Sequence, residues 1–456
     1  TTGFDQLKEH VRPFTPEWAY SITDLTPKMI RDSAIEMAHA APAVMIHPGR
    51  HVTWYGDDTQ RSRAIGILNA LLGSWGRRGG FYFNEKAKVP KFPAPGYPEP
   101  AWTAKDLNIN LPLAKEGVTN NVIKASLPKT DLPHQVKAWF VAATNLTYSV
   151  PEDREVFKKA LEALEFLVVI DLYNVEIAGY ADVVLPECSY LERHDIVRTS
   201  EFREPSIALR VPAAQPRWES KPGWEIAKLI GDKLGLNEYF NYKNFEEVLR
   251  WQLEKMGTSY DEMLKIGVKN LPRTSGPLYI EDGAEHTFKT PSGKIELYSK
   301  ELEEFGFDPM PVFTAHEQPP MNYFRLIYGR APMHTFSKTV NSPHLNDLRS
   351  ENNLWINPRV AKIWNLKPGQ EVWLQNQDEV TSSFPIKVRL TERIRWDSVY
   401  MVHGFGHKDK NMTRAYGKGI NDTEMITKVM VDPLMGGTGM RGNFVTILTE
   451  NPKETV

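Results

Sequence analysis

The sequence predicts an α/β protein in which parallel-sheet, Rossmann-like domains precede a carboxyl-terminal β-barrel. Two observations lead to this fold class. Short apolar runs alternate with helical patterns over residues 27–236, and strands that alternate with helices form parallel sheets. After about residue 310, short β-rich runs such as FRLIYGR, NNLWINP and QEVWLQNQ lie between turn residues, which is typical of a compact barrel.

The first predicted α/β unit lies in the amino-terminal part of the chain. Thr26 and the proline after it predict the start of a helix, and the apolar run PAVMIHPGR (42–50) predicts a buried strand. A second helix follows and ends in the glycine-rich residues 73–80. Arg50 and His51 would follow the strand at the edge where such sheets bind ligands. We interpret them as active-site residues that hold an anionic substrate; the alternative is a packed surface turn.

Residues 83–134 are rich in Pro, Lys and Asn and show no periodic pattern, so we predict a long ordered loop. The α/β pattern then resumes. The predicted strands cover 137–145, 166–174 and 182–187, and the predicted helices cover 149–164 and 222–236.

Polar residues at the ends of these strands form a candidate nucleotide site. Asn145 and Asp171 follow two apolar strands, and Asp182 precedes a third. A carboxylate at such a position can accept a hydrogen bond from a ribose hydroxyl or a guanine amino group, although a lone Asp171 could simply cap a turn. No GxGxxG follows any of the strands, which argues against an ordinary NAD site.

Two segments of the predicted barrel are dense in polar donors. YGRAPMHTFSKTVNSPHLND (328–347) mixes an arginine, hydroxyls and amides with apolar residues, a pattern that suits phosphate or pterin edges, though it could be a solvated loop. MVHGFGHKDK (401–410) places two histidines around Gly-Phe-Gly. No carboxylate-rich partner set with ligand spacing is nearby, so we expect no metal ligands here and interpret the glycines as points of close approach to a bulky ligand.

Composition limits the kind of protein. The 456 residues carry a formal net charge of −2 and 41% hydrophobic residues, which is ordinary for a globular chain. A near-neutral chain offers no basic face, so we expect no nucleic-acid partner. The single cysteine, Cys188, excludes an internal disulfide and a four-cysteine zinc or iron–sulfur site formed by this chain alone.

Three stretches together resemble the molybdopterin oxidoreductases of the dimethyl sulfoxide reductase family. They are DDTQRSRAIGILNALLGSWGRRGG, VAATNLTYSVPE with VVIDLYNVEIAGYADVVLPECSYLER, and LWINPRVAKIWNLKPGQEVWL. The resemblance covers most of the chain. Within the family, GRHVTWYGDDTQR and GRAPMHTFSKTVN are most similar to the catalytic subunits of polysulfide and thiosulfate reductases.

The resemblance implies a domain order and a set of site residues. The later part of an α/β domain would cover 1–90, a loop or insertion 91–134, an α/β dinucleotide-binding domain 135–315, and a dinucleotide-binding barrel of the double-psi type 316–456. Asn145, Asp171 and Asp182 would belong to one dinucleotide site. The barrel would line the pterin and phosphate region with Arg330, His334, Thr335, Ser337, Thr339, His403, Gly404, Gly406, His407 and Asn421.

The resemblance also implies cofactors and partners. We expect molybdenum bis(molybdopterin guanine dinucleotide), and a [4Fe–4S] cluster in an amino-terminal part that this chain lacks. The expected reaction is a two-electron reduction of a small inorganic sulfur substrate in anaerobic respiration. Electrons would come from an iron–sulfur electron-transfer subunit and a membrane quinol-linked anchor subunit, which places the enzyme in the periplasm or at the outer face of the cytoplasmic membrane.

The sequence departs from the family pattern at its beginning. It lacks the cluster cysteines and the metal-ligating residue of the family's amino-terminal region, so we interpret it as the later portion of a larger catalytic subunit. Cys188 follows a strand of a nucleotide-binding segment, and we interpret it as a buried small residue. The alternatives are an arsenate or tetrathionate reductase, or a structural electron-transfer subunit that has lost molybdenum.

Overall fold

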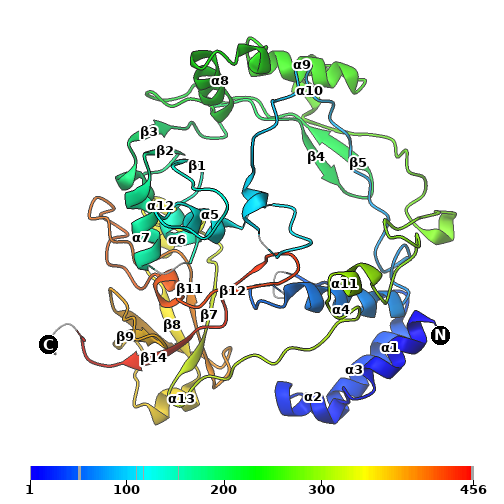
Figure 1. Ribbon diagram of the computed structural model, residues 1–456, viewed down its shortest axis with the longest axis vertical. Helices are drawn as coiled ribbons and strands as arrows, with labels where there is room; N and C mark the ends of the chain where they lie inside the picture. The colour runs from blue at the N-terminus through cyan, green and yellow to red at the C-terminus, as the bar shows by residue number, and fades with distance from the viewer. Residues whose placement is uncertain (1, 50–52, 109, 117, 152–153, 453–456) are drawn as a thin grey trace. The chain divides into compact units, whose positions relative to one another are not determined.

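The computed structural model describes residues 2–49, 53–108, 110–116, 118–151 and 154–452. The chain divides into two compact units (Figure 1). The first comprises Thr1–Val52, Thr59–Pro98 and Cys188–Phe313, and the second comprises Thr53–Asp58, Glu99–Glu187 and Thr314–Val456. Each unit therefore collects segments that are far apart in the sequence. The division into four consecutive domains stays a prediction.

The first unit contains most of the helices. Its helices are α1 (Gly3–Val11), α2 (Pro16–Thr23), α3 (Pro27–Ala40), most of α4 (Asp58–Leu71), α8 (Gly223–Lys233), η4 (Asn237–Phe240), α9 (Phe245–Lys255), α10 (Tyr260–Ile266), η5 (Ile280–Asp282) and α11 (Lys300–Glu304). Thr2, Thr15 and Thr26 cap α1, α2 and α3 by accepting a backbone N–H, as the sequence predicts for Thr26.

An antiparallel sheet and two helices form the core of the first unit. The strands are β4 (Arg198–Glu201), β5 (Pro205–Ala208) and β6 (Val268–Asn270), in the order β4-β5-β6. Leu249 and Leu253 of α9 and Met263 of α10 pack with Ile207 of β5. These four side chains are fully buried, so their removal from water stabilises this part of the unit.

The prediction of a strand at 42–50 is wrong over the residues that the structure describes. Residues 44–48 have no regular secondary structure. The Asn69 side chain of α4 takes the place of a neighbouring strand: Ile46 N donates to Asn69 Oδ1 (2.9 Å), and Asn69 Nδ2 donates to Ile46 O (2.8 Å). A side-chain amide satisfies the backbone here, which an apolar pattern does not reveal.

The second unit opens with a parallel sheet, as predicted. Its strands are β1 (Ala138–Ala142), β2 (Phe166–Asp171) and β3 (Val183–Pro186), in the order β1-β2-β3. Trp139, Val141 and Leu167 face Phe157 of α7 (Arg154–Ala163), and together they bury one face of the sheet. The carboxyl ends of β1 and β2 therefore meet at one edge, which is where ligands bind in such folds.

The segment 83–134, predicted as a long ordered loop, includes two short helices that the sequence pattern did not predict. The segment contains η2 (Ala104–Leu107) and α5 (Thr119–Ala125). Ile123 of α5 is fully buried in the core of the parallel sheet. A helix of this length has too few turns to show an apolar period in the sequence, and its contact with the sheet stabilises it. Short helices α6 (Leu146–Ser149) and η3 (Glu176–Tyr180) follow β1 and β2.

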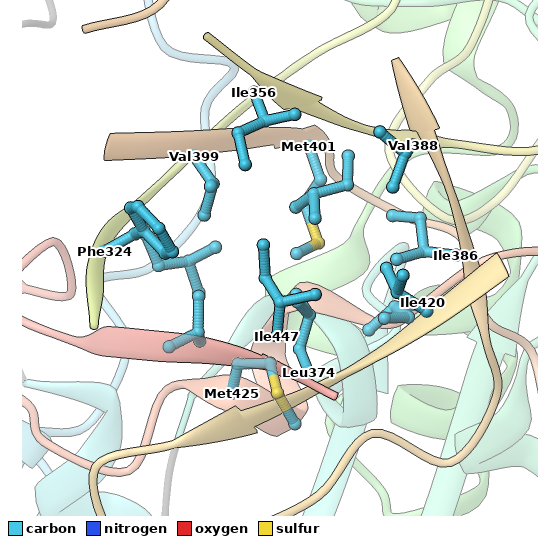
Figure 2. Close-up of a cluster of buried hydrophobic side chains, with 14 of the residues drawn as sticks. Phe324, Ile356, Leu374, Ile386, Val388, Val399, Met401, Ile420, Met425 and Ile447 are labelled. Atoms are coloured by element: carbon cyan, nitrogen blue, oxygen red, sulfur yellow. The ribbon is translucent and has the colours of Figure 1, made fainter. Parts of the chain in front are cut away.

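The predicted barrel is present and closed. Its six strands are β7 (Phe324–Gly329), β8 (Asn353–Ile356), β9 (Glu371–Asn376), β10 (Ile386–Leu390), β11 (Ser398–Val402) and β14 (Phe444–Leu448), in the order β10-β8-β11-β7-β14-β9. The barrel is flanked by α12 (Pro343–Leu348), α13 (Pro358–Ile363), η6 (Asp422–Met425) and the hairpin of β12 (Met430–Val431) and β13 (Thr438–Gly439). Figure 2 shows the buried side chains pointing toward the centre of the barrel, among them Leu374, Val399 and Met401.

Gly404 and Gly406, in the barrel segment 401–410, each lie close to another part of the chain's own backbone, where we expected close approach to a ligand. Both have positive φ, +94° at Gly404 and +74° at Gly406. A Cβ on Gly404 would lie 2.6 Å from the Phe336 carbonyl carbon, and one on Gly406 would lie 2.2 Å from Asn421 N. The close approach is therefore to the chain's own backbone. The loop that contains these two glycines therefore packs closely against other backbone segments of the barrel domain.

We predict that Gly406→Ala destabilises the second unit by about 3 kcal/mol or more. A non-glycine residue at positive φ costs about 1–2 kcal/mol, and the overlap with Asn421 adds to it. Gly369→Ala is the matched control, because Gly369 has φ +77° and no atom within 4 Å of an added Cβ. Urea unfolding of both variants checks the prediction; equal losses of stability would contradict it.

Candidate functional site

The candidate site lies in the second unit, where the carboxyl edge of the parallel sheet meets segments of the barrel. Asn145 follows β1 and is fully buried. Its Nδ2 donates to Glu176 Oε2 (2.7 Å) and to Ser337 Oγ (3.3 Å), and its Oδ1 accepts from Thr147 Oγ1 (2.8 Å). The structure thus brings together the predicted residues Asn145 and Ser337, which are 192 positions apart.

Asp171 ends β2 at the same edge and is paired with a cation. Lys338 Nζ donates to Asp171 Oδ2 (2.7 Å), and Tyr173 N donates to Oδ1 (3.1 Å). The side chains are 15% and 3% exposed for Lys338 and Asp171. A buried ion pair needs such additional hydrogen bonds to offset desolvation. The sequence analysis missed Lys338, although the residue lies within the polar segment 328–347.

Asp182 does not join this set. It lies immediately before β3, and its Oδ2 accepts from Leu167 N at the amino end of β2 (2.7 Å). Asp171 is at the opposite end of β2. The expectation that Asp182 shares one site with Asn145 and Asp171 is therefore corrected: Asp182 satisfies a backbone donor at the other edge of the sheet.

His407 connects the glycine loop to the sheet. Its Nδ1 bonds Glu176 Oε1, its Nε2 contacts Gly404 O (3.1 Å), and its ring stacks on Tyr148 with centroids 4.7 Å apart. The Tyr148 hydroxyl donates to Gly406 O (3.0 Å). Burial, and then the charge of Glu176, raise the pKa of Tyr148 far above its usual range. With both ring nitrogens engaged, His407 positions the loop.

The segment after β7 folds back on itself around His334. His334 Nε2 contacts Arg349 O (2.8 Å) and Nδ1 contacts Thr339 Oγ1 (3.4 Å), while Thr335 N donates to the same hydroxyl (2.8 Å). His334 and Thr339 are buried, and Thr335 is exposed. Of these three predicted residues, only Thr335 is exposed to solvent.

A cationic patch, defined here as Arg330 and His403, lies beside this segment. The Arg330 guanidinium is over the Phe336 ring, 4.1 Å from its centroid, and is exposed. Phe336 contacts the His403 ring edge to face at 5.9 Å. His403 Nδ1 lies 2.9 Å from Asp422 Oδ2. Burial alone would lower the pKa of His403, but the charge and hydrogen bonds of Asp422 raise it above its ordinary value.

Asn421 completes the predicted barrel residues. Its Oδ1 accepts from Thr423 N (3.1 Å) and Thr423 Oγ1 (2.8 Å), so it caps η6. Over the described part of the chain, its Nδ2 makes no hydrogen bond. The amide therefore retains donors for a ligand.

Sequence reasoning missed the two acids that organise the site. Glu176 binds Asn145 and His407, and Asp422 binds His403. Glu176 lies 231 positions from His407, so no local spacing could have revealed the pair. Its one sequence signal is its place directly after a strand of the parallel sheet, where side chains face the ligand edge.

Arg50 and His51 lie outside the described residues, and their assignment stays a prediction. Trp54 and Tyr55 follow them and are held by Asp58, whose carboxylate accepts from Trp54 N (2.9 Å) and Tyr55 N (3.1 Å). Among the residues that the structure describes, no three His, Cys, Asp or Glu side chains form a group that could hold a metal ion, and no helix is long and apolar enough to cross a membrane.

The donors of the site suit a molybdopterin dinucleotide. Arg330 and the Nδ2 of Asn421 carry N–H groups with no partner in the described ranges, and His403, whose pKa the charge of Asp422 raises, adds positive charge when it is protonated. Cations and amide donors of this kind bind phosphate and pterin oxygens.

Two family models match the chain. The model described as molybdopterin oxidoreductase matches residues 20–233, and the model described as molydopterin dinucleotide binding domain matches residues 324–443. The second match contains the barrel strands β7 to β11 and the segments around Arg330 and His403, and it ends just before β14.

Several proteins of known name are similar over most of the chain. The thiosulfate reductase molybdopterin-containing subunit PhsA of Salmonella typhimurium is 31% identical over 96% of this chain and 62% of its own length. The arsenate respiratory reductase molybdopterin-containing subunit ArrA of a Shewanella species is 23% identical over 87% of this chain and 55% of its own. The solved acetylene hydratase from Pelobacter acetylenicus has the same fold, with a TM-score of 0.78 at 18% identity, over 98% of this chain and 66% of that one.

The chain spans 62% and 55% of the length of these two relatives. The two matched ranges together cover most of the chain; the first contains the parallel sheet, and the second contains five of the six barrel strands. Sequence, fold and site chemistry agree, and the chain belongs to the molybdopterin oxidoreductases of the dimethyl sulfoxide reductase family.

Proposed function

We propose that the chain belongs to the catalytic subunit of a molybdenum-dependent respiratory oxidoreductase that reduces an inorganic sulfur compound such as thiosulfate or polysulfide. The observation that carries the proposal is the 31% identity, over 96% of the chain, with a thiosulfate reductase subunit. The similarity covers 96% of the chain, so it extends through the parallel sheet and most of the barrel.

The cofactor that we propose is molybdenum bis(molybdopterin guanine dinucleotide). When bound, it supplies two-electron redox chemistry. Asn145 and Asp171 offer an amide and a carboxylate at the carboxyl edge of the sheet, which suit the amino group of guanine. Arg330, His403 and Thr335 offer positive charge and a hydroxyl to phosphate and pterin oxygens. The acids Glu176 and Asp422 hold the side chains around them in place.

The electron path is also a proposal. A [4Fe–4S] cluster needs four thiolates, and the single cysteine is buried, so the cluster ligands would lie elsewhere in the enzyme. An iron–sulfur electron-transfer subunit and a membrane quinol-linked anchor would deliver electrons at the outer face of the cytoplasmic membrane or in the periplasm. The family resemblance of the sequence supports these three proposals.

We further propose that the barrel is of the double-psi type. Two parallel pairs, β7 with β11 and β8 with β10, lie on either side of the antiparallel pair of β8 and β11, and the other three neighbouring pairs are antiparallel. Parallel neighbours require crossover connections, and such interlocked crossovers support this topology.

An arsenate reductase is the second candidate. The 23% identity with an arsenate respiratory reductase over 87% of the chain supports it. Turnover of the intact enzyme with thiosulfate, polysulfide, tetrathionate and arsenate, each with a reduced dye as electron donor, tests both candidates. The proposal requires the highest kcat/KM for a sulfur compound; arsenate turnover alone would overturn it.

We predict that Asp171→Ala lowers the content of guanine nucleotide in the purified enzyme. Loss of a charge-assisted hydrogen bond of about 1.5–3 kcal/mol weakens nucleotide binding roughly 10- to 100-fold. The measurement is the guanine nucleotide released on denaturation, per protein. Lys338→Met is the matched control, because it breaks the same ion pair and keeps the carboxylate. An unchanged nucleotide content in Asp171→Ala, or an equal loss in both variants, would refute guanine recognition.

We predict that Arg50→Ala lowers kcat/KM at least tenfold, about 1.4 kcal/mol, because an anionic substrate needs preorganised positive charge. Arg31→Ala is the control, since Arg31 lies on α3 and forms an exposed ion pair with Glu17. Steady-state kinetics of the intact enzyme provide the readout. A change within about twofold, roughly 0.4 kcal/mol, would show that Arg50 has no such function.

We predict a pH-dependent contribution of His403 to stability. Its pKa is raised in the folded protein, so the stabilisation is fully present below the unfolded value of about 6.5 and is lost as pH rises through the folded value. Removing one partner of a buried pair costs about 3–5 kcal/mol. His403→Gln should therefore lose most stability at pH 5.5 and less at pH 9, by urea unfolding. The exposed His344, changed to Gln, should show no such difference.

A further inference from the structure

A buried arginine outside the predicted site has no anionic partner among the residues that the structure describes. Arg441 lies just before β14 and is 6% exposed. Its guanidinium is 4.7 Å from the ring centroid of Trp54, 5.7 Å from that of Tyr55 and 5.8 Å from that of Tyr328. We call Arg441 and these three rings the aromatic box. All four residues belong to the second unit.

The polar groups of the aromatic box are poorly satisfied. Arg441 Nη1 donates to the Tyr55 hydroxyl and Nη2 to Tyr328 O, both at 3.4 Å. Arg441 Nε and the Tyr328 hydroxyl are buried and make no hydrogen bond within the described ranges. No carboxylate of the described residues forms an ion pair with Arg441. A guanidinium has five N–H donors, and two long bonds leave most of them unused.

This arrangement is unfavourable without a ligand. Buried arginines are almost always paired, and an uncompensated buried charge costs several kcal/mol. Ring faces attract the cation, but they do not accept the hydrogen bonds that point outward in the plane of the guanidinium. The box therefore supplies a desolvated cation, and most of its N–H donors have no acceptor among the described residues.

The backbone holds Arg441 in this place. Arg441 N donates to Trp54 O (2.9 Å), and a Cβ on Gly439 would lie 2.5 Å from Gly56 N. Trp54 has φ +77° and is fixed by the bond from its N–H to Asp58. A strained, well-anchored residue beside an unpaired cation is typical of a preorganised ligand site.

We propose that Arg441 and the Tyr328 hydroxyl bind a tetrahedral oxyanion in the aromatic box. The planar fork of the guanidinium donates to two oxygens of such an anion, and the Tyr328 hydroxyl donates to a third. The donors of the aromatic box are sufficient to indicate an oxyanion as the ligand. Its assignment to a sulfur oxyanion such as thiosulfate rests on the proposed function, and the phosphate of the dinucleotide cofactor is the other source of the same chemistry.

Two measurements on the intact, cofactor-loaded enzyme distinguish a substrate oxyanion from a cofactor phosphate as the ligand of the aromatic box. Isothermal titration gives the dissociation constants for thiosulfate, sulfate and arsenate, and denaturation gives the nucleotide released per protein. For a substrate site, Arg441→Met should weaken oxyanion binding at least tenfold at unchanged nucleotide content. If the aromatic box instead binds a phosphate of the cofactor, Arg441→Met should contain less nucleotide. The fraction of this variant that still holds the cofactor should then bind oxyanions with unchanged affinity.

Three further variants keep the test decisive. Arg389→Met is the matched control, because Arg389 also stacks on a ring of the barrel, 4.9 Å from the Trp355 centroid, but is exposed; it should change neither measurement. Arg441→Lys keeps the charge without the fork and should bind with intermediate affinity. Tyr328→Phe removes only the hydroxyl, so it answers the question if Arg441→Met does not fold, and it should weaken binding severalfold.

The outcomes also distinguish this site from the proposed function. Arg441-dependent binding of oxyanions in an enzyme that turns over no sulfur compound would support the site and overturn the proposed substrate. Unchanged oxyanion affinity and unchanged nucleotide content in both Arg441→Met and Tyr328→Phe would overturn the site, whatever the enzyme reduces.

Discussion

The arrangement of the site depends on one buried carboxylate, that of Glu176. One of its oxygens accepts from Asn145 and the other bonds His407. Through these two bonds it joins the strand end after β1 to the glycine loop that follows β11. A carboxylate buried in this way must be fully hydrogen-bonded to be tolerated. This carboxylate therefore links the parallel sheet to the barrel segments of the second unit.

Patterns of apolar residues in the sequence predicted most of the regular secondary structure of the second unit. Apolar runs predicted β1, β2 and β3, and short β-rich runs between turn residues predicted the barrel. The strands β1 and β2 and those of the barrel bury apolar side chains, whereas the residues of β3 are exposed or half-buried. The strand expected at 42–50 was wrong over its described residues, since Asn69 satisfies the backbone of Ile46 there. The helix α5 was missed because its stability comes from Ile123 in the core of the sheet.

The sequence predicted which segments form the site better than it predicted the contacts of individual side chains. Segments 328–347 and 401–410 do supply the polar groups near the sheet edge. However, His334 and His407 bind the protein itself, and Asp182 lies at the other edge. Arg441 was missed because GTGMRGNF reads as a glycine turn, and only the three rings around the guanidinium distinguish it. Contacts over such sequence distances leave no local pattern.

The separation of 231 residues between Glu176 and His407 has a consequence for biosynthesis. The sheet strands leave the ribosome long before the loop that completes their ligand edge. At translation rates of about 5–20 residues per second, the interval is roughly 10–50 s. During this time Glu176 and Asn145 lack their distant partners and stay open to water. An assembly chaperone or a cofactor-delivery protein would find the edge accessible in that interval, before the arrival of residue 407 closes it.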